Sequence, residues 1–485
     1  MTPIAGFAPD ADPTSPGVLT DCENIVPYPA GFMGAPSAVS VGANALAAEC
    51  RGAVVATKLD GSRRIFAGTQ TKLYELNGTS WTDRSAGGGS YTGSSESRWS
   101  YCQFGDTTIA SNLADDMQSS SSGAFAAIAG APKAKVVVSA SNNFVLAFNT
   151  NEGTYGQSQD RWWCCAQGDQ TDWTPDVSTS SNTGRLVAVE GAIQAALTLG
   201  DYVVAYKQRA IFVGSYVGAP VVWQWNLIPG GEAGAVGQEA VCDIGGAHFI
   251  VGNDNFWIFD GTRPVPLGTG VNRQWFLDHS SPTYRYRTKA TFDKQNNLVR
   301  VNYPSNTSTG TCDACLVFHV GTKRWGRNDV TIEAPLNYIA PGVTIDGLNS
   351  YGATIDVLPN IPFDSQYWLS GGQTPAYFNG SHSLVSMNGA SVSSSFTTGD
   401  LGDDNLVSVL DRFRVRFLQS PTTATATGFF KMNEGDTLQA GASNAINDGK
   451  FDMRQSGRFH RVRIDMTGDH QETQFQGQPK RTGGR

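Results

Sequence analysis

The sequence has little charge for its length. Lys, Arg, Asp and Glu make up 16% of its 485 residues, whereas soluble domains usually contain about 25%. The formal net charge is −8, and the basic residues form no block along the chain. Tight binding to nucleic acid through phosphate neutralisation is therefore disfavoured, although a neutral or acidic surface still lets a polyanion pass.

Long hydrophobic runs are missing as well. No apolar run approaches the roughly 18 residues that a membrane-spanning helix needs, so we expect no membrane span. The N-terminus, MTPIAGFAPDADP, has neither a basic n-region nor an apolar h-region, and it does not resemble a secretory signal. The 8 cysteines are scattered, which is typical of reduced, buried thiols in a protein made in a cytoplasm.

The motifs of common active sites are absent. The 6 histidines show no HExxH or HxH spacing, and there is no GxSxG elbow, Walker loop or strand–GxGxxG–helix unit. We therefore predict no catalytic, cofactor-binding or metal-ligating residue, no cofactor and no enzyme activity. Paired carboxylates for glycoside hydrolysis can lie far apart in a sequence, so polysaccharide cleavage stays as the least favoured alternative.

A few segments come closest to a ligand site, but each is better explained without one. The CxxC pair has no second pair nearby for zinc, the glycine-rich segment follows a turn, and the acidic–amide runs do not match an EF-hand loop. These segments are Cys312 with Cys315, GEAGAVG at 231–237, Asp254 between Asn253 and Asn255, and Asp403, Asp404 and Asn405.

The chain instead contains short alternating or apolar runs separated by Gly, Asn, Asp and Ser. Examples are 53–57, 135–138, 201–206 and 298–303. The best helical candidate, 187–199, is equally well explained as a loop followed by a strand. Short strands bounded by turn residues are typical of a sandwich, barrel or propeller.

Two patterns recur along these runs. LYELNGTSW at 73–81, FWIFDGTRP at 256–264 and LVFHVGTKRW at 316–325 each read as a strand, a Gly-Thr turn and a second strand. FGDTTIAS at 104–111, LGDYVVAY at 199–206 and, more loosely, IGGAHFIVG at 244–252 form the second pattern. Its glycines at 105, 200 and 245 are 95 and 45 residues apart, close to two units and one unit of about 47 residues, the size of a four-stranded propeller blade.

The predicted fold is all-β: a degenerate β-propeller of five or six blades with an additional C-terminal antiparallel β-domain or insertion. We expect an extended Pro/Gly-rich N-terminal arm at 1–50, in neither a helix nor a regular sheet, and the propeller body at 51–335. An irregular tip or docking insertion at 336–400 follows. C-terminal strands at 401–470 either complete the propeller or form a separate β-domain, and 471–485 is a flexible tail.

The C-terminal region contains two strongly alternating segments, RFRVRF at 412–417 and RFHRVRID at 458–465. The first places Arg412, Arg414 and Arg416 on one face of a strand and the intervening apolar residues on the other. Arg458, Arg461 and Arg463 form a less regular version. Such a face is either solvated or meets carboxylates of a neighbouring subunit, and the strand pattern does not decide between these interpretations.

Several segments together resemble the tail-hub or nozzle proteins of short-tailed (podovirus-like) bacteriophages, including the packaged-DNA stabilisation type. The resemblance covers roughly 5–335 and 405–466, and it depends on the order of the segments more than on any single one. They are PGVLTDCENIVPYPAGFMGAPS at 16–37, RWSYCQFGDTTIASNLADDMQ at 98–118, RWWCCAQGDQTDWTP at 161–175, GNDNFWIFDGTRPVPLG at 252–268 and RQSGRFHRVRI at 454–464.

The resemblance implies a structural virion protein that is made in the host bacterial cytoplasm and assembles as a homohexameric ring at the distal end of the phage tail. Such a ring retains packaged DNA and provides the channel for its ejection. Tail adaptor or portal-side proteins and tail fibres or spikes would be its partners, and double-stranded DNA would pass without sequence-specific binding. Because the net charge is −8, we expect the channel wall to be neutral or acidic.

A second class of function stays open. A β-propeller of this size also suits a binding module that recognises a glycan or a protein at a cell surface. A six-membered ring would favour the virion role, whereas a stable monomer that binds glycans would favour the binding module.

Overall fold

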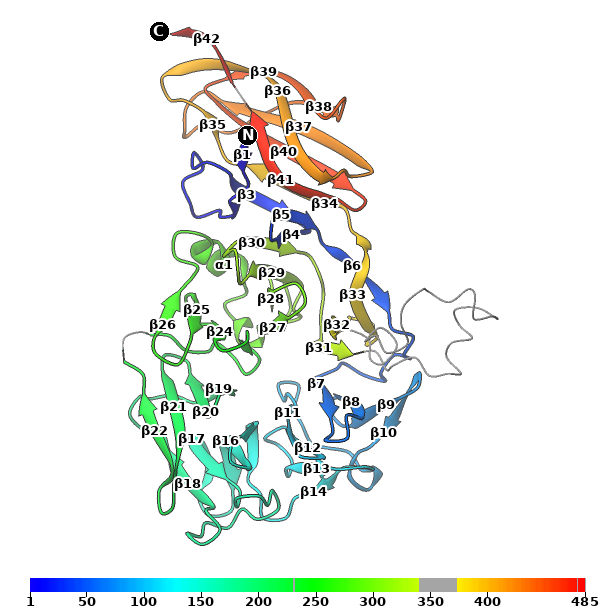
Figure 1. The fold of residues 1–485 in the computed structure, drawn as a ribbon, viewed down its shortest axis with the longest axis vertical. Coiled ribbons are helices and arrows are strands. Elements are labelled where there is room, and N and C mark those ends of the chain that lie inside the picture. The colour runs from blue at the N-terminus through cyan, green and yellow to red at the C-terminus, as the bar shows by residue number, and fades with distance from the viewer. Residues whose placement is uncertain (230–231, 340–372, 478, 485) are drawn as a thin grey trace, which may run out of the picture.

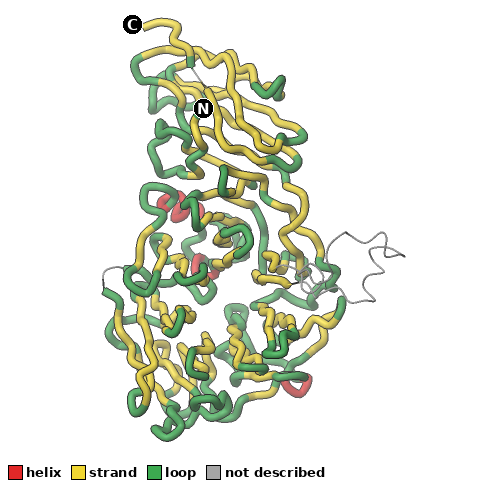
Figure 2. The backbone as a smooth tube through the Cα atoms, in the orientation of Figure 1, coloured by secondary structure: helices red, strands yellow, loops and turns green. Residues whose placement is uncertain are grey.

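The computed structural model describes residues 1–229, 232–339, 373–477 and 479–484. The chain is almost entirely β, with 54% strand and 3% helix. Sheets arranged in a ring form one end of the elongated molecule, and a two-sheet unit containing both chain termini forms the other (Figures 1 and 2). The prediction of an all-β propeller with a further C-terminal β-domain is confirmed.

The ring contains six blades, each an antiparallel four-stranded unit of consecutive strands within the described residues 53–328. This agrees with the prediction of five or six blades. Blades 1 to 3 consist of β7 (Ala53–Thr57), β8 (Arg63–Gly68), β9 (Leu73–Asn77), β10 (Ser80–Asp83); β11 (Ser100–Phe104), β12 (Thr107–Ser111), β13 (Gln118–Ser120), β14 (Ala126–Ala127); and β15 (Lys133–Ala140), β16 (Phe144–Glu152), β17 (Gly156–Cys164), β18 (Asn182–Arg185).

Blades 4 to 6 repeat the same plan, although β27–β30 also belong to a larger sheet. They consist of β19 (Ile193–Leu199), β20 (Tyr202–Lys207), β21 (Ile211–Gly218), β22 (Val222–Leu227); β23 (Val241–Asp243), β24 (His248–Val251), β25 (Phe256–Phe259), β26 (Pro264–Pro266); and β27 (Lys289–Asp293), β28 (Leu298–Tyr303), β29 (Ala314–His319), β30 (Trp325–Asn328).

The ring is closed by a composite sheet, called the closing sheet here. Its strands are β31 (Ala334–Ile339), β32 (Gln373–Phe378), β33 (Leu384–Ser391) and β6 (Pro36–Ser40). The first strand of each blade contacts the first strand of the next, and β31 contacts both β27 and β7. An N-terminal strand therefore supplies the outer edge of the last sheet in the ring, next to β33 (Figure 1).

The Gly-Thr segments form the predicted hairpins. Asn77 pairs with Ser80, so Gly78 and Thr79 make the tight turn between β9 and β10, and Gly78 has the positive φ of 62° that such a turn requires. The segments at 256–264 and 316–325 join β25 to β26 and β29 to β30. The repeat in the sequence therefore corresponds to the third and fourth strands of three blades.

The core of the propeller lies between neighbouring blades. Separate clusters of buried side chains join blades 1 and 2, 2 and 3, 3 and 4, and 4 and 5, and another joins blade 1 to the closing sheet. Phe144 and Leu146 of blade 3, for example, pack in one cluster with Val203 of blade 4. Each blade is stabilised by apolar burial against the next, which is the main reason that a ring of small sheets folds.

The second unit, called the terminal sandwich, packs two sheets face to face. One sheet has the order β2–β3–β34–β40–β37–β38 with β35 on β40, and the other contains β5–β41–β36–β39 with β1 on β41 and β42 on β36. The strands from the C-terminal part are β34 (Ser394–Thr398), β35 (Leu401–Gly402), β36 (Leu406–Gln419), β37 (Thr423–Lys431), β38 (Gln439–Ala445), β39 (Phe451–Gly457), β40 (Phe459–Thr467), β41 (Gln471–Gly477) and β42 (Lys480–Gly484).

The N-terminal arm is extended as predicted, but it is built into both sheets of the terminal sandwich and into the closing sheet. Its prolines do not prevent this, because most of its strands are short. The strands before β6 are β1 (Thr2–Pro3), β2 (Gly6–Phe7), β3 (Val18–Glu23), β4 (Ile25–Tyr28) and β5 (Gly31–Gly34). The expectation that this segment forms no regular sheet is wrong, because its strands pair with each other, as β4 does with β5, and with strands more than 300 residues away: Cys22 pairs with Phe396 and Phe32 with Glu472.

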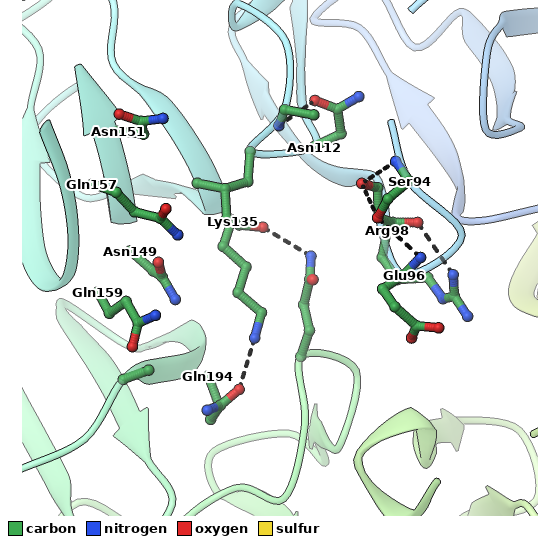
Figure 3. Close-up of a pocket in the computed structure, with 15 residues that line it drawn as sticks. Ser94, Glu96, Arg98, Asn112, Lys135, Asn149, Asn151, Gln157, Gln159 and Gln194 are labelled. Atoms are coloured by element: carbon green, nitrogen blue, oxygen red, sulfur yellow. Dashed lines mark hydrogen bonds between the residues drawn. The ribbon is translucent and has the colours of Figure 1, made fainter. Parts of the chain in front are cut away.

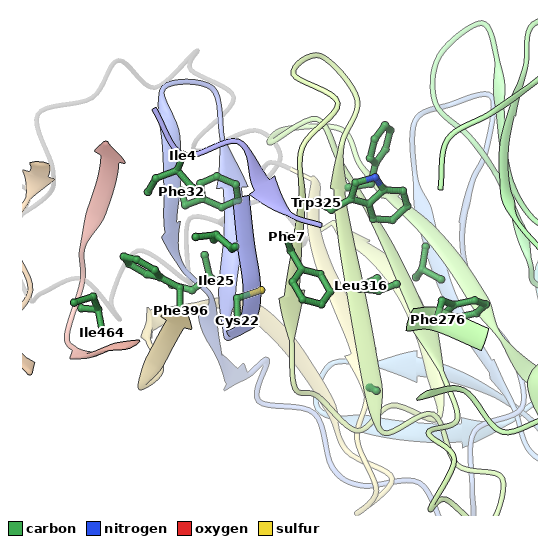
Figure 4. Close-up of a cluster of buried hydrophobic side chains, with 14 of the residues drawn as sticks. Ile4, Phe7, Cys22, Ile25, Phe32, Phe276, Leu316, Trp325, Phe396 and Ile464 are labelled. Atoms are coloured by element: carbon green, nitrogen blue, oxygen red, sulfur yellow. The ribbon is translucent and has the colours of Figure 1, made fainter. Parts of the chain in front are cut away.

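The arm joins the propeller to the terminal sandwich. β4 pairs with β30 of blade 6 through Arg327 and Ile25, and β5 pairs with β41, so one sheet runs from the propeller into the sandwich. A single buried cluster follows the same path from Leu316 of blade 6 through Phe32 of the arm to Ile464 of the sandwich (Figure 4). Gly31 permits this approach, because a Cβ there would lie 2.0 Å from the carbonyl oxygen of Glu472.

Two expectations for the C-terminal half need correction. Residues 471–477, predicted to be a flexible tail, form β41, which pairs with both β36 and β5. Most of the predicted irregular tip, 340–372, lies outside the described residues, whereas the flanking residues 373–398 form β32, β33 and β34. β33 and β41 each have a partner more than 300 residues away, in β6 and β5, and a turn-rich or polar composition did not reveal this pairing.

Helix is limited, in the described ranges, to α1 (Arg273–His279) and two short 3₁₀ turns, η1 (Ala86–Gly88) and η2 (Arg285–Arg287). α1 begins without a capping side chain of its own. Asp10 of the arm supplies the cap, because its carboxylate accepts hydrogen bonds from the backbone N–H groups of Gln274 and Trp275 at 2.6 and 2.9 Å. Across these ranges, no helix has the length and apolar character to cross a bilayer.

Candidate functional site

A polar cavity opens on the face of the ring where the inner strands begin. It has a volume of about 470 Å³, within the range of about 300–1,000 Å³ that small-ligand sites occupy. Its walls come from the loop 94–98 before blade 2, the β12–β13 loop, the β16–β17 hairpin of blade 3, and the entries to blades 4 and 5. We call it the mouth cavity (Figure 3).

Amide side chains dominate this cavity. Four of them, Asn149, Asn151, Gln157 and Gln159, come from the two strands of the β16–β17 hairpin, where Asn151 pairs directly with Gln157. They stand in a column along one wall in Figure 3. No described residue forms a hydrogen bond with the side chains of Asn151, Gln157 or Gln159, so their donors and acceptors face the cavity or solvent.

Asn149 is the most constrained member of the column. The register of β16 against β17 shifts between Phe148 and Thr150, and Asn149 has a φ of 54°, the left-handed conformation that Asn tolerates. Such a bulge turns a side chain out of the strand alternation. The Asn149 side chain is buried, its Nδ2 donates to the carbonyl of Ile193 at 3.1 Å, and its Oδ1 has no donor within the part of the chain that the structure describes.

Lys135 lies opposite the column, on the inner strand β15. Its Nζ donates to Oε1 of Gln194 at 2.7 Å, and its own carbonyl accepts from Nε2 of Gln238 at 2.8 Å. None of the described carboxylates forms an ion pair with it. Burial lowers the pKa of Lys135 to about 8, because the charged form is poorly solvated there.

The remaining charges of the cavity lie in the loop 94–98. Arg98 donates only to backbone carbonyls, those of Ser95 and Ser97. The carboxylate of Glu96 is already engaged by the guanidinium of Arg287 and the hydroxyl of Tyr286. The free charge of the cavity is therefore positive, which favours an anionic group in a ligand.

A second cavity of about 390 Å³ lies against the inner strands of blades 1 to 5. Its lining is mostly small or apolar, as at Ala53, Val137 and Ala196, and Gln238 lies in the walls of both cavities. The second cavity is lined by no cation, and its only carboxylate is Glu239, whose side chain is paired with Lys289. It offers few groups for recognising a ligand.

The mouth cavity has no arrangement suited to catalysis. No His, Cys or Asp is part of its lining, and its serines form hydrogen bonds within the loop 94–98. Nucleophilic catalysis needs a base beside the nucleophile, and glycoside hydrolysis needs two carboxylates. Over the described ranges, no three His, Cys, Asp or Glu side chains gather in a group that could hold a metal ion.

The CxxC pair does not form a site. Cys312 packs with Ile332 and Tyr377 at the closing sheet, whereas Cys315 packs with Val26 and Val317 at the arm. Burial raises the pKa of both thiols to about 12, so neither is a ready nucleophile or metal ligand.

The other candidate segments are turns with satisfied groups. In 232–237, the described part of the glycine-rich segment, the N–H of Ala235 donates to the carbonyl of Lys207 at 2.9 Å. Asp254 lies 3.6 Å from Arg273, and Asp403 accepts from the backbone N–H of Asn405 at 2.8 Å. These contacts explain the residues without a ligand.

The two arginine series behave differently. Arg412, Arg414 and Arg416 are exposed on β36, while Phe413 and Val415 between them are buried, as the alternation predicts. Arg412 lies 3.5 Å from Asp452, but the guanidinium groups of Arg414 and Arg416 have no partner in the described residues.

The guanidinium groups of the second arginine series all have partners within the chain. Arg461 pairs with the buried Asp400 and Arg463 with Asp465, and Arg458 donates to Asn433. Only the first series therefore presents free positive charge to solvent.

The mouth cavity was not predicted from the sequence. The segment NTNEGTYGQSQ at 149–159 does place an amide at every second position on both strands of a hairpin. That alternation is also what an ordinary solvated strand shows. The bulge at Asn149 and the approach of Lys135 from a neighbouring strand are the features that turn the pattern into a cavity.

Comparisons with known proteins identify no family for this chain. No protein-family profile matches the chain, and no curated protein is similar to it in sequence. Among solved structures, it is similar to the computationally designed Ika8 protein, with 9% identity and a TM-score of 0.36 over 73% of this chain and 100% of that one.

Two natural proteins show the same level of similarity. YCF48 from Cyanidioschyzon merolae has 10% identity and a TM-score of 0.37 over 73% of this chain and 98% of that one. The extracellular domain of the putative one component system BT4673 from B. thetaiotaomicron has 8% identity and a TM-score of 0.40 over 85% of this chain and 46% of that one. Similarity this distant gives no information about function.

Proposed function

We propose that this chain is a structural virion protein of a short-tailed bacteriophage, where it forms the homohexameric ring of the tail hub or nozzle. In this role the ring retains packaged DNA and gives it a channel into the host. The support is the ordered series of segments that resembles this family, together with the all-β propeller and its second β-unit. The partners are further copies of the chain, tail adaptor or portal-side proteins, and tail fibres or spikes.

The observation that carries the proposal is the integration of the N-terminal arm. The segment at 16–37, where the resemblance begins, forms β3, β4, β5 and part of β6 and shares one buried cluster with the propeller and the terminal sandwich. A continuous sheet and core make the two units one stiff body. A subunit that transmits force along a tail needs such stiffness, whereas a module that only binds a ligand does not.

Electron microscopy of the purified intact protein tests this proposal. We expect six-fold rings at micromolar concentration, with a molecular mass of six chains by light scattering. A lumen whose wall is neutral or acidic would agree with the expected passage of DNA. A protein that stays monomeric at all concentrations, alone or mixed with tail adaptor protein, would contradict the proposal.

A second candidate function is a propeller binding module for a cell-surface glycan or protein. The mouth cavity favours it, because the side chains of Asn151, Gln157 and Gln159 have no partner in the described residues and Lys135 has only a neutral one. Binding of the monomer to a glycan array would support this alternative. Polysaccharide cleavage is the weakest candidate, since the only carboxylate in the cavity, Glu96, is already paired with Arg287.

A further inference from the structure

The mouth cavity contains polar groups that the fold leaves without partners. The clearest is Oδ1 of Asn149, which belongs to a buried side chain and has no donor in the described residues. A buried acceptor without a donor destabilises a fold. The side chains of Asn151, Gln157 and Gln159 also line the cavity and have no partner in the described residues.

The spacing of the amides indicates what kind of ligand this is. Gln157 and Gln159 lie two positions apart on β17, and Asn151 of β16 pairs with Gln157. Residues two apart in a strand repeat about every 6.6–6.8 Å, which is also the repeat of backbone groups along one side of an extended peptide. A peptide lying along the hairpin can therefore meet an amide at each repeat, and each amide offers both a donor and an acceptor.

The charge of the cavity indicates which side chain the peptide carries. Lys135 has only the neutral Oε1 of Gln194 as a side-chain partner, and Arg98 has only backbone carbonyls. A carboxylate placed between the amide column and Lys135 would form a charge-assisted hydrogen bond with the ammonium. The lowered pKa of Lys135 agrees with a cation that lacks such a partner.

A sugar fits the cavity less well. Glycan sites commonly place an aromatic ring beneath the apolar face of a sugar, and the lining of the mouth cavity contains no aromatic residue. The amides of Gln157 and Gln159, two apart on one strand, match a peptide backbone, whose donors and acceptors alternate at fixed spacing, better than the irregular hydroxyls of an oligosaccharide.

We propose that the mouth cavity binds an extended acidic segment of another protein, with its backbone along the β16–β17 hairpin and one Asp or Glu side chain on Lys135. This inference goes beyond the proposed tail role, since it concerns the face of a single propeller and does not require a ring. Partner recognition then combines a backbone contact that tolerates many sequences with one charge contact that selects among them.

The test uses the intact protein and an array of random hexapeptides, each made with Glu and with Gln at one central position. We expect more protein to bind to the Glu-containing peptides than to the matching Gln-containing peptides. Lys135→Gln should weaken binding to the Glu versions by about tenfold or more, the effect of losing one charged hydrogen bond, and leave the Gln versions unchanged. The control is Lys294→Gln, which removes the same charge from an exposed turn of blade 6 and should change neither.

A second variant tests the backbone contact separately. The double change Gln157→Ala with Gln159→Ala removes two exposed amides and should weaken the Glu and Gln versions equally, because the backbone is common to both. Equal retention of Glu and Gln versions by the unmodified protein would overturn the proposal, and so would the absence of peptide binding. Lys135-dependent binding of polygalacturonate without any peptide binding would replace it with an acidic-glycan site.

Discussion

The propeller and the terminal sandwich are both antiparallel β-structures, but they are assembled in opposite ways. Each of the six blades consists of strands that follow one another in the chain, so most of its pairing is local. The terminal sandwich takes strands from both ends of the chain, and its central pairs, such as Leu19 with Thr398, connect residues almost 400 positions apart. Local pairs cost less loop-closure entropy than distant ones.

This difference suggests that the propeller could fold by itself and the sandwich could not. The shared core argues against two independent units, however. Phe32 and Cys22 of the arm, Trp325 of blade 6 and Phe396 of the sandwich belong to one cluster. We therefore expect the two regions to unfold together, with the arm as the link that makes them cooperative.

The largest effect should come from breaking that link. Phe32 is fully buried in the shared cluster, and Phe32→Ala should lower the free energy of unfolding by about 3–5 kcal/mol. Because the loss falls at the link, the single transition of the unmodified protein should separate into two, with the sandwich unfolding first. Differential scanning calorimetry measures this.

Val39→Ala is the matched control, since Val39 also lies in the arm but its side chain is 43% exposed. We expect it to leave a single transition near the original temperature. A Phe32→Ala protein with one unshifted transition would show that the shared cluster does not couple the two regions.

A second comparison uses buried histidines in both regions. His248 of the propeller and His460 of the sandwich are both fully buried, and burial lowers the pKa of each below 6.5. Because the folded protein holds them neutral while the unfolded chain protonates them, stability is complete above pH 6.5 and falls as the pH drops below it. At pH 5.5 each of the two histidines should therefore lower the free energy of unfolding by up to about 1.4 kcal/mol.

Urea unfolding at pH 7.5 and 5.5 checks this in both regions at once. The free energy of unfolding should decrease between pH 7.5 and pH 5.5. His248→Gln or His460→Gln should each make this decrease smaller by about the contribution of one histidine. If the regions are cooperative, both replacements affect the same transition. A stability that does not change between these pH values would contradict the assignment of buried neutral histidines.

The smallest effect on stability concerns the exposed arginines of the sandwich. Arg414 and Arg416 have no partner in the described part of the chain, so replacing both by Ser should change the free energy of unfolding by less than about 0.5 kcal/mol. If the face of β36 meets carboxylates of a neighbouring copy in the ring, the same variant should fail to form hexamers. Light scattering and calorimetry on one sample distinguish the two effects.

The control removes two exposed cations from the propeller instead, Arg63→Ser with Lys294→Ser, and should assemble normally. If both variants form hexamers equally well, the arginine face of β36 is exposed to solvent in the ring. The terminal sandwich would then connect the two ends of one chain, and its arginine face would not form a contact between subunits.

The sequence was informative where pairing is local. Gly78 and Gly261 mark hairpins whose two strands lie within ten residues of each other, and the blade repeat follows from such hairpins. The arm and the tail could not be placed in the same way. The partners of β3, β6 and β41 are set by burial against segments hundreds of residues away, and short polar or proline-containing strands contain no local signal of that pairing.

The candidate site shows the same limit. The alternating amides at 149–159 can be read directly, but their meaning depends on a bulge at Asn149 and on Lys135 from another strand. The arginine alternation on β36 was predicted correctly because a strand determines it by itself. Features that one strand or one tight hairpin fixes were predictable, whereas the cavity and the pairing of the arm depend on how several separate strands meet.

The position of β6 also has a consequence for how the protein is made. This strand leaves the ribosome before any of the six blades, yet it pairs with β33, for example Val39 with Ser386, which is synthesised only after all of them. The ring can therefore close only late in synthesis, and the arm lacks its distant partners until then. During that interval its apolar strands are exposed, so the nascent chain should be most prone to aggregation or chaperone binding through residues 1–40.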